Sequence, residues 1–380
     1  MKITLQLNFP KSIQEIVEKL HEQYEVYYVG GCVRDTLLHK EIHDFDATTN
    51  ATPDEMKQIL SSYKVIETGI KHGTLTIINQ SNSIEITTYR TDLKYENHRT
   101  PQIAFSNDIH EDLKRRDFTI NALACDIDGN LIDDHQGLSD LNQHLIRCVG
   151  EASVRFEEDA LRILRALRFA HALQFDIEPK TQQAIFEKKD LLSCISVERK
   201  TKELFGMLMD PHPDLYSLLN EYGLLEVFYL QYSDRIHQQL NKSPLDLECR
   251  LASLFYHEKY AKKILKLWKC SKKTIQHVTI LIQERNRPLY SIDYELRRIY
   301  YLYHQDKALL NKILLYAHYP DIFDQIQVFE KLNIDGKDLL NLGYEKKQIK
   351  EKLAACLEYC LKHPEKNDLN QLIDYLKMQE

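Results

Sequence analysis

The sequence lacks the segments by which proteins enter or cross membranes. No hydrophobic run is long enough to span a bilayer, and the N-terminal MKITLQLNFPKS shows no signal-peptide core. The eight cysteines have no paired CxxC spacing, so we expect thiols in a reducing cytoplasm rather than disulfides or zinc ligands. Cys356 and Cys360 are one helical turn apart and are expected to share a helix face.

An excess of basic residues is also missing. Lysine and arginine total 50 against 57 acidic residues, which gives a net charge of −7. This sum does not exclude a nucleic-acid binder, because phosphate contacts need only local basic patches. One candidate patch is a helix predicted within residues 259–273, although an ordinary solvated face fits the same spacing. Its exposed face would carry Lys262, Lys266, Lys269 and Lys273. Its buried face would carry Ile264, Leu265 and Trp268.

The sequence has no internal repeat, no low-complexity segment and no Pro/Gly-rich hinge. The domain organisation is therefore inferred from the periodicity of its hydrophobic residues. Two-residue alternation and turns dominate up to about residue 148, and nearly everything beyond Gly150 has a helical pattern. With 380 residues, 43% of them hydrophobic, the chain is expected to form more than one domain. We predict four segments: 1–148, 149–205, 206–325 and 326–380.

A motif near the N-terminus indicates nucleotide chemistry, although it is neither a P-loop nor a dinucleotide-binding glycine motif. Residues 24–29 have the composition of a strand, and Gly30-Gly31 allows a tight turn and a close approach of the backbone to a ligand. Arg34 and Asp35 then open a helix, which places N–H groups and a guanidinium where a polyphosphate would lie. This order fits a nucleoside triphosphate; a plain hairpin turn is the alternative.

Asp44 and Asp46 follow in an Asp-x-Asp pattern. In an extended strand both side chains would point to one face, about 6–7 Å apart, where two carboxylates can share divalent cations. Glu85 would supply a third carboxylate, because a strand that buries Ile84 and Ile86 directs Glu85 to the other face. If the two strands are neighbours, three carboxylates converge. An exposed glutamate on an amphipathic strand is the alternative.

A basic motif lies within residues 111–126. Arg115, Arg116 and Asp117 precede an apolar run that contains Asn121. This pattern fits phosphate or ribose contacts at the mouth of a cleft, and a capped helix start is the alternative.

Residues 155–175 predict one strongly periodic helix. A charged ridge runs along it at three-residue spacing: Asp159, Arg162, Arg165 and Arg168. The Watson–Crick edge of cytosine carries one amino donor and two acceptors, which a carboxylate and a guanidinium together can satisfy, and adenine can use part of the same set. Asp159 and Arg162 are the pair we expect to read a base; a solvated face with intrahelical ion pairs is the alternative.

Together these motifs resemble those of the class II tRNA nucleotidyltransferases, the bacterial type of CCA-adding enzyme. The resemblance spans nearly the whole chain, with the strong motifs between residues 26 and 205. Its elements are GGCVRD (30–35), DFD (44–46), RRDFTINA (115–122), EDALR (158–162), ERKTKE (198–203) and, more weakly, KLNIDGKDLLNLG (331–343).

The resemblance implies an α+β nucleotidyltransferase head of the polymerase β type, with a mixed sheet and helices, followed by all-helical neck, body and tail that hold tRNA. The four predicted segments would be these parts in order. It implies template-independent addition of CCA to the tRNA 3′ end from CTP and ATP. A CC-adding or A-adding enzyme and a poly(A) polymerase share the head and neck motifs and stay open as alternatives. The carboxylate set disfavours a non-catalytic RNA-binding protein.

The resemblance also assigns the residues of the reaction centre. Asp44 and Asp46 would bind two Mg²⁺ ions, and Glu85 would complete the carboxylate set. The triphosphate contacts would be Gly31, Arg34 and Arg116.

Base reading is assigned to the residues around 160. Asp159 and Arg162 would read the incoming CTP or ATP, and Arg165 and Arg168 would help to hold the nucleotide. The helix that carries them would be braced by Glu198, Arg199 and Glu203.

Residues 90–114 are polar and poor in periodicity, so we expect a mobile segment near the active site. The resemblance implies a loop here that helps the site change from CTP to ATP, and its length disfavours a CC-only enzyme. Arg99-Thr100-Pro101 stands where the family usually has Arg-Arg-Pro.

Overall fold

The structure is a computed structural model that describes residues 4–96, 100–212, 214–288, 290–317 and 326–379, with only the backbone between residues 92 and 102. The chain divides into two compact units, Met1–Tyr232 and Ser233–Glu380. The finer division at residues 148, 205 and 325 stays a prediction. Arg99 lies outside the described residues, so the Arg99-Thr100-Pro101 motif has no structural account.

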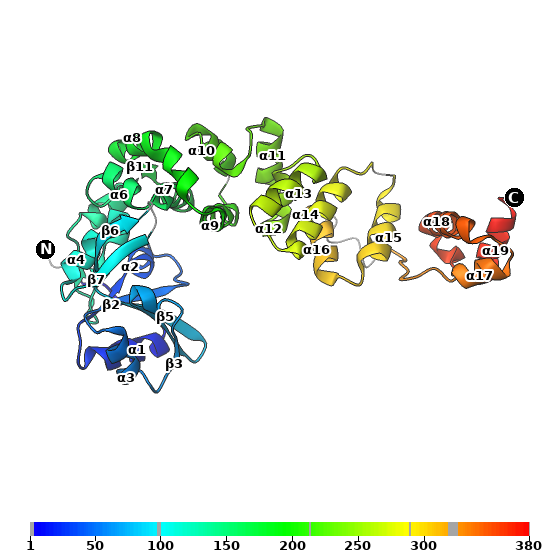
Figure 1. Cartoon of the computed structure of the whole chain (residues 1–380). Coiled ribbons are helices and arrows are strands. Elements are labelled where there is room, and N and C mark those ends of the chain that lie inside the picture. Colours follow the sequence, from blue (N-terminus) through cyan, green and yellow to red (C-terminus); the bar gives the residue numbers. More distant parts are fainter. Residues whose placement is uncertain (1–3, 97–99, 213, 289, 318–325, 380) are drawn as a thin grey trace. The chain divides into compact units, whose positions relative to one another are not determined.

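Strands and short helices make up the first part of the first unit (Figure 1). In chain order they are α1 (Lys11–His21), β1 (Val26–Val29), α2 (Gly31–Leu37), β2 (Phe45–Thr49), α3 (Pro53–Ile59), β3 (Lys64–Ile66), η1 (Ile70–His72), β4 (Thr74–Asn79), β5 (Asn82–Thr88), β6 (Arg90–Glu96), β7 (Thr100–Phe105), α4 (Ile109–Lys114), η2 (Thr119–Asn121), β8 (Ala124–Cys125), β9 (Leu131–Ile132), α5 (Gly137–Asn142) and β10 (Leu145–Ile146).

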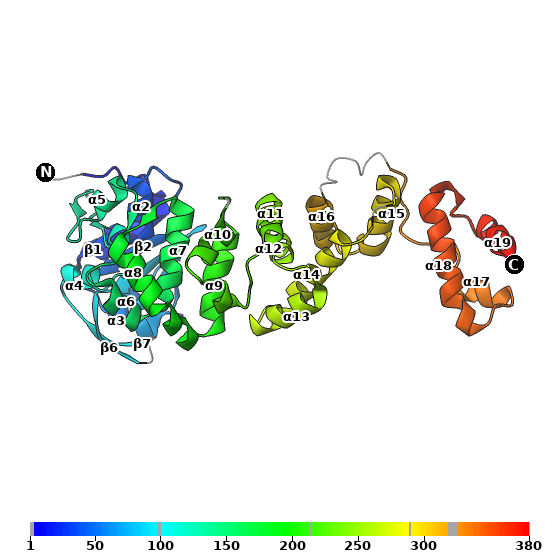
Figure 2. The same cartoon turned by 90° about the horizontal axis from the view of Figure 1, so that it is seen from above.

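Helices dominate the rest of the first unit, as the change of periodicity near residue 150 predicted. They are α6 (Ala152–Glu158), α7 (Leu161–Leu173), α8 (Pro179–Lys188), η3 (Lys189–Cys194), α9 (Val197–Leu208), α10 (Leu215–Glu221) and η4 (Glu226–Phe228), with the short strand β11 (Asp176–Ile177) after α7. Helix α9 packs against α7, and the two lie side by side in Figure 2.

A seven-stranded mixed sheet holds the first unit together, in the order β3-β4-β5-β2-β1-β8-β9. Strands β2 and β5 run parallel, whereas β1 pairs with both β2 and β8 in antiparallel fashion. Helix α1 packs on β4 and β5 and buries its apolar stripe. On β5, Ile84 and Ile86 are fully buried and Glu85 between them is exposed, as the alternation predicted. The predicted α+β fold with a mixed sheet is confirmed.

The segment 90–114 is more regular than its sequence predicted. Strands β6 and β7 form a two-stranded antiparallel sheet with a register shift between Asp92 and Lys94, and α4 follows it. The main-chain hydrogen bonds of a hairpin do not depend on side-chain periodicity, which is why the pattern missed these strands. The N–H of Arg90 at the base of the hairpin donates to Asp112 on α4 over 3.4 Å.

The prediction of a single helix over residues 155–175 is wrong, because the helix is interrupted at Asp159. Asp159 has extended backbone angles, φ −143° and ψ 101°, and separates α6 from α7. Its side chain accepts the N–H of Leu161 at 3.1 Å, and such local bonds compete with the helical ladder. The predicted ridge therefore consists of arginines on α7 with an aspartate just before the helix.

The second unit is helical. Its elements are α11 (Asp234–Lys242), α12 (Leu247–Ser253), α13 (Glu258–Leu267), α14 (Lys272–Arg285), α15 (Ile292–Tyr303), α16 (Lys307–Tyr316), α17 (Gly336–Asn341), α18 (Lys346–Lys362), η6 (Pro364–Lys366) and α19 (Leu369–Lys377). Cys356 and Cys360 share the buried face of α18, as predicted, in a core with Leu339 and Leu372. Among the described residues, no helix is both long and apolar enough to cross a membrane.

The lysine face predicted within residues 259–273 is not one helical face. Helix α13 ends at Leu267, Lys269 has a left-handed φ of 57°, and Ser271 caps the next helix. The predicted burial of Ile264, Leu265 and Trp268 is confirmed.

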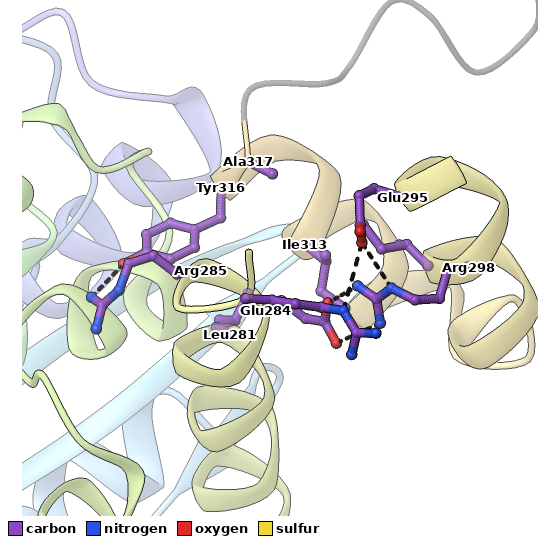
Figure 3. A pocket seen from close by; sticks show the side chains of 10 residues that line it. Leu281, Glu284, Arg285, Glu295, Arg298, Ile313, Tyr316 and Ala317 are labelled. Atoms are coloured by element: carbon purple, nitrogen blue, oxygen red, sulfur yellow. Dashed lines mark hydrogen bonds and ion pairs between the residues drawn. The ribbon is translucent and has the colours of Figure 1, made fainter. Parts of the chain in front are cut away.

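A cavity of about 250 Å³ lies among α14, α15 and α16 of the second unit (Figure 3). Arg298 binds Glu284 and, at 2.8 Å, Glu295. Arg285 donates to the carbonyls of Ala252 and Phe255. These charged side chains therefore bind one another or backbone carbonyls of the same unit, and we assign no ligand to the cavity.

Candidate active site

One cleft of about 630 Å³ in the first unit contains most of the predicted site residues. This volume is within the range typical of small-molecule sites. The predicted residues that line it are Gly31, Arg34, Asp44, Asp46, Glu85, Arg116, Arg165 and Arg168. They come from α2, β2 and the residue before it, β5, α7 and the segment after α4.

The acidic edge of the cleft is formed by two parallel strands. Asp46 on β2 is the register partner of Glu85 on β5, and Asp44 directly precedes β2. Phe45 and Ala47 are buried on the other face, so the alternation directs Asp46 toward the cleft. Burial raises the pKa of Asp46 to about 6, with Glu85 and Asp44 adding to the rise and Arg116 opposing it.

The donor chemistry of this edge fits a hard divalent cation. In the part of the chain that the structure describes, no group of three or more His, Cys, Asp or Glu side chains is already arranged to hold a metal. The three predicted carboxylates line one cleft without forming a finished ligand set. However, burial raises the pKa of Asp46 and the negative charges of Glu85 and Asp44 add to the rise, so a cation here would stabilise the ionised carboxylates, and oxygen ligands suit Mg²⁺.

Gly30 brings the backbone close to this edge. Its φ of 70° and ψ of −131° are strained for a residue with a side chain. A Cβ built on it would lie 3.5 Å from Arg116 Nη1 and 3.7 Å from Asp46 Oδ2. The glycine turn therefore leaves room between a guanidinium and a carboxylate, as the sequence predicted for a ligand that approaches the backbone.

A chain of hydrogen bonds links the arginines of the head to α7. Arg34 binds both carboxylate oxygens of Asp35 at 2.8 Å and donates to Asn121 Oδ1 at 2.8 Å. Asn121 donates to the buried Asp117, which also receives Arg165 Nε at 2.7 Å. Burial opposes ionisation of Asp117, yet Arg165 and Arg162 hold the pKa of its carboxyl below the usual range.

Arg116 is held by a buried carboxylate that does not itself line the cleft. Its Nη2 donates to the buried carboxylate of Asp112 at 3.0 Å, and Arg115 binds the other oxygen of Asp112 at 2.6 Å. Arg116 Nε is buried without a hydrogen-bond partner. Asp112 therefore orients Arg116 while Nη1 of the same guanidinium lies near Gly30.

Among the cleft-lining residues that sequence reasoning missed are Phe169 on α7 and Lys202 on α9. Phe169 follows Arg165 by one helical turn, so the spacing that selected the arginines could have found it. Lys202 is exposed and adjoins Glu203, which binds Arg168 Nε at 2.6 Å. Nothing in the local pattern separates Lys202 from an ordinary surface lysine.

Asp159 and Arg162 do not line this cleft. Arg199 on α9 binds Asp159 through both terminal nitrogens, at 3.2 and 2.7 Å. Arg162 is largely buried and donates to Glu158 at 2.7 Å and to the carbonyl of Arg115 at 3.1 Å. Two of the three residues expected to brace from α9 make ion pairs, Arg199 with Asp159 and Glu203 with Arg168, and the bracing by Glu198 stays a prediction.

Comparison with known proteins places these features in a family. Residues 26–147 match the family model of the poly(A) polymerase head domain, and residues 174–234 match a model described as the probable RNA- and SrmB-binding site of polymerase A. The chain is 54% identical to the CCA-adding enzyme of Lactobacillus johnsonii over 198 residues, which cover 52% of this chain and 49% of that enzyme. This match thus spans about half the length of its relative.

Two other similarities extend over the full length. The CCA-adding enzyme of Enterococcus faecalis is 35% identical over 413 aligned positions, covering 100% of this chain and 98% of that one. The crystal structure of the Bacillus stearothermophilus CCA-adding enzyme in complex with CTP has a TM-score of 0.81 and 28% identity, covering 97% and 98% of the two chains. The resemblance found in the motifs is thereby confirmed, and the chain belongs to the family of the CCA-adding enzymes.

Proposed function

We propose that this protein adds C, C and A in turn to the 3′ end of tRNA, taking them from CTP and ATP and releasing pyrophosphate, without a nucleic-acid template. The observation that carries the proposal is the cleft in which Asp46 and Glu85 face the side chains of Arg34 and Arg116. Membership of the family supports the same reaction, since the full-length relative is named a CCA-adding enzyme.

We propose Mg²⁺ as the cofactor, held by Asp44 and Asp46 with Glu85 beside them. When bound, Mg²⁺ would lower the pKa of the tRNA 3′-hydroxyl and stabilise the charge on the departing pyrophosphate. The protein's own part is to keep these carboxylates on one strand edge. Most of the acceleration then comes from positioning and charge rather than from a protein base.

The arginines of the cleft supply positive charge for the triphosphate. Gly31, Arg34 and Arg116 would contact the triphosphate, with Asp35, Asn121 and Asp112 fixing the guanidiniums. Arg165 and Arg168 would help to hold the nucleotide from α7. Because carboxylate partners already orient these side chains, less entropy is lost when the nucleotide binds.

We further propose that Asp159 and Arg162 read the base. Each is already held by a partner, Asp159 by Arg199 and Arg162 by Glu158. Reading would use the remaining hydrogen-bonding capacity of these groups or require them to turn toward the cleft. Arg199 would then act as the residue that sets the direction of the Asp159 carboxylate.

The domain roles follow the predicted division. We propose a catalytic head over residues 1–148, a nucleotide-reading neck over 149–205, a body over 206–325 and a tRNA-binding tail over 326–380. A cytoplasmic location is proposed as well. It is supported by the state of the cysteines, since all eight are free thiols.

The test is to incubate the protein and Mg²⁺ with tRNA that lacks its last three nucleotides, with CTP, ATP or both. Product lengths are then resolved to one nucleotide. Addition of two nucleotides with CTP and of three with both substrates would support CCA addition. Intact tRNA serves as the control that should not be extended.

A second candidate is poly(A) synthesis, because the family model matching residues 26–147 describes a poly(A) polymerase head. It predicts a long ladder of products with ATP alone. A halt after two nucleotides in every mixture would instead indicate a CC-adding enzyme. Addition of a single nucleotide to tRNA that already ends in CC, with none added to the shorter tRNA, would indicate an A-adding enzyme.

A further inference from the structure

Phe169 is surrounded by three guanidinium groups. Its side chain lies on α7, lines the cleft and is 8% exposed. The guanidinium carbons of Arg34 and Arg165 are each 5.2 Å from the ring centroid, and that of Arg168 is 4.7 Å away. All three distances are within the range of cation–π attraction. One ring thus contacts cations from α2 and from its own helix.

The ring itself is held in place by packing. Phe118 contacts it in a T-shaped arrangement, with the centroids 5.8 Å apart and the planes at 81°. Phe118 is fully buried and lies between Asp117 and η2, next to the hydrogen-bonded network of the head. Packing against Phe118 therefore helps to fix the orientation of the Phe169 ring.

Each of the three arginines also has one carboxylate partner: Asp35 for Arg34, Asp117 for Arg165 and Glu203 for Arg168. Among the described residues, the hydrogen bond of Arg168 runs through Nε, so its terminal nitrogens stay available to a ligand. Arg165 uses Nε and Nη2 for Asp117, which leaves Nη1. The carboxylates and the ring together hold the three guanidinium groups close to one another. N–H donors are left over for binding an anion.

We propose that Phe169 is a positioning residue whose aromatic ring gathers the guanidiniums of Arg34, Arg165 and Arg168 so that they bind the phosphates of the nucleoside triphosphate together. This inference rests on the proposed function. Three like charges repel one another, and the negative face of an aromatic ring offsets part of that repulsion. An aliphatic side chain of similar size would fill the space without this attraction.

The test compares Phe169→Leu with Phe169→Tyr, which keeps the ring. Phe175→Leu is the matched control, because Phe175 is also 8% exposed and packs against His144 outside the cleft. Dissociation constants are measured for CTP, ATP and inorganic tripolyphosphate with the full-length protein and Mg²⁺. Rates of CMP addition to tRNA then separate KM from kcat, and circular dichroism reports folding.

We expect Phe169→Leu to raise the dissociation constants of CTP, ATP and tripolyphosphate by the same factor, about 10-fold. KM should rise by a similar factor while kcat changes less. Phe169→Tyr and Phe175→Leu should bind all three ligands as the unmodified protein does. If Phe169→Leu does not fold, Phe169→Met refills the same volume with an unbranched apolar chain and carries the same expectation.

Three results would overturn the proposal. Unchanged tripolyphosphate binding by Phe169→Leu would mean that the ring contacts the base rather than arranging the arginines. Equal losses of ligand affinity in Phe169→Leu and Phe169→Tyr would show that the aromatic ring is not the cause. Equal losses of affinity in Phe169→Leu and Phe175→Leu would indicate an effect of packing alone. If the unmodified protein extends no tRNA, the proposed function fails, but tripolyphosphate binding still decides the role of Phe169.

Discussion

Asp46 on β2 lies directly opposite Glu85 on β5, in a parallel register. Partners in neighbouring strands project to the same face, so both carboxylates reach the cleft from one side of the sheet. Burial raises the pKa of Asp46 to about 6, and the negative charges of Glu85 and Asp44 add to the rise. A cation bound at this edge would offset both the burial of Asp46 and the repulsion between the two carboxylates.

Removal of Asp44 should abolish nucleotide addition without unfolding the protein. Asp44 is exposed and precedes β2, so Asp44→Ala should leave stability almost unchanged. The rate of CMP addition to tRNA should fall on the order of 1,000-fold or more, because a charge-stabilising ligand is lost. Asp54→Ala, an exposed carboxylate on α3, is the control and should keep its activity. A normal turnover for Asp44→Ala would discard the metal assignment.

Gly30→Ala should cost both stability and nucleotide binding. The alanine would have to adopt a strained φ of 70°, and its Cβ would fill the space beside Arg116 Nη1 and Asp46 Oδ2, at 3.5 and 3.7 Å. We expect a loss of about 1–3 kcal/mol in the free energy of unfolding, measured in urea, and weaker CTP binding.

Gly343→Ala is the matched control for this substitution. Gly343 also has a positive φ, 94°, but nothing lies within 4 Å of its Cβ position. Its substitution should cost stability through backbone strain alone and leave CTP binding unchanged. Equal effects of both substitutions on CTP binding would show that the space at Gly30 is not needed.

Arg199→Lys should relax the choice of nucleotide. Lysine cannot make the two-nitrogen contact that Arg199 makes with Asp159, so the carboxylate loses its fixed direction. We expect the preference for CTP over UTP, measured as the ratio of kcat/KM values, to fall by about 10-fold. The double variant with Asp159→Ala should be no worse than Asp159→Ala alone, because Arg199 acts through Asp159. Additive losses would contradict this role.

The buried Asp112 should make stability depend on pH in the acid range. Burial opposes its ionisation, but Arg116 and Arg115 hold the pKa of Asp112 below its unfolded value. The folded state therefore binds fewer protons than the unfolded one, and the contribution is complete above the unfolded pKa of about 4. It is lost as the pH falls through the lowered folded pKa.

Urea unfolding of Asp112→Asn, followed between pH 7 and pH 3, tests this account. The variant should be less stable at pH 7 by about 3–5 kcal/mol, since it leaves two arginines without their carboxylate, and its stability should fall less steeply in acid. Glu111→Gln, on the exposed side of α4, should follow the unmodified protein. An unchanged acid slope for Asp112→Asn would exclude Asp112 as the titrating group.

Several parts of the site were predictable because they depend on local geometry. The alternation around Glu85 determined its exposed face, and the glycine pair before Arg34 indicated the turn that leaves room in the cleft. The break at Asp159 was not predictable in the same way, since the carboxylate of Asp159 is held by Arg199 from a helix about 40 residues further along the chain as well as by the N–H of Leu161. Helical periodicity continues across such a break and conceals it.

The sequence by itself determined which residues carry charge, which strand faces are apolar and where the backbone must turn, because these properties depend on near neighbours. Tertiary structure alone decided that β5 lies parallel to β2, that Asp117 joins Arg165 to Asn121, and that Arg34 from α2 lies over the ring of Phe169. Those contacts join segments far apart in the chain. Their partners are selected by packing of the whole unit, which no local pattern records.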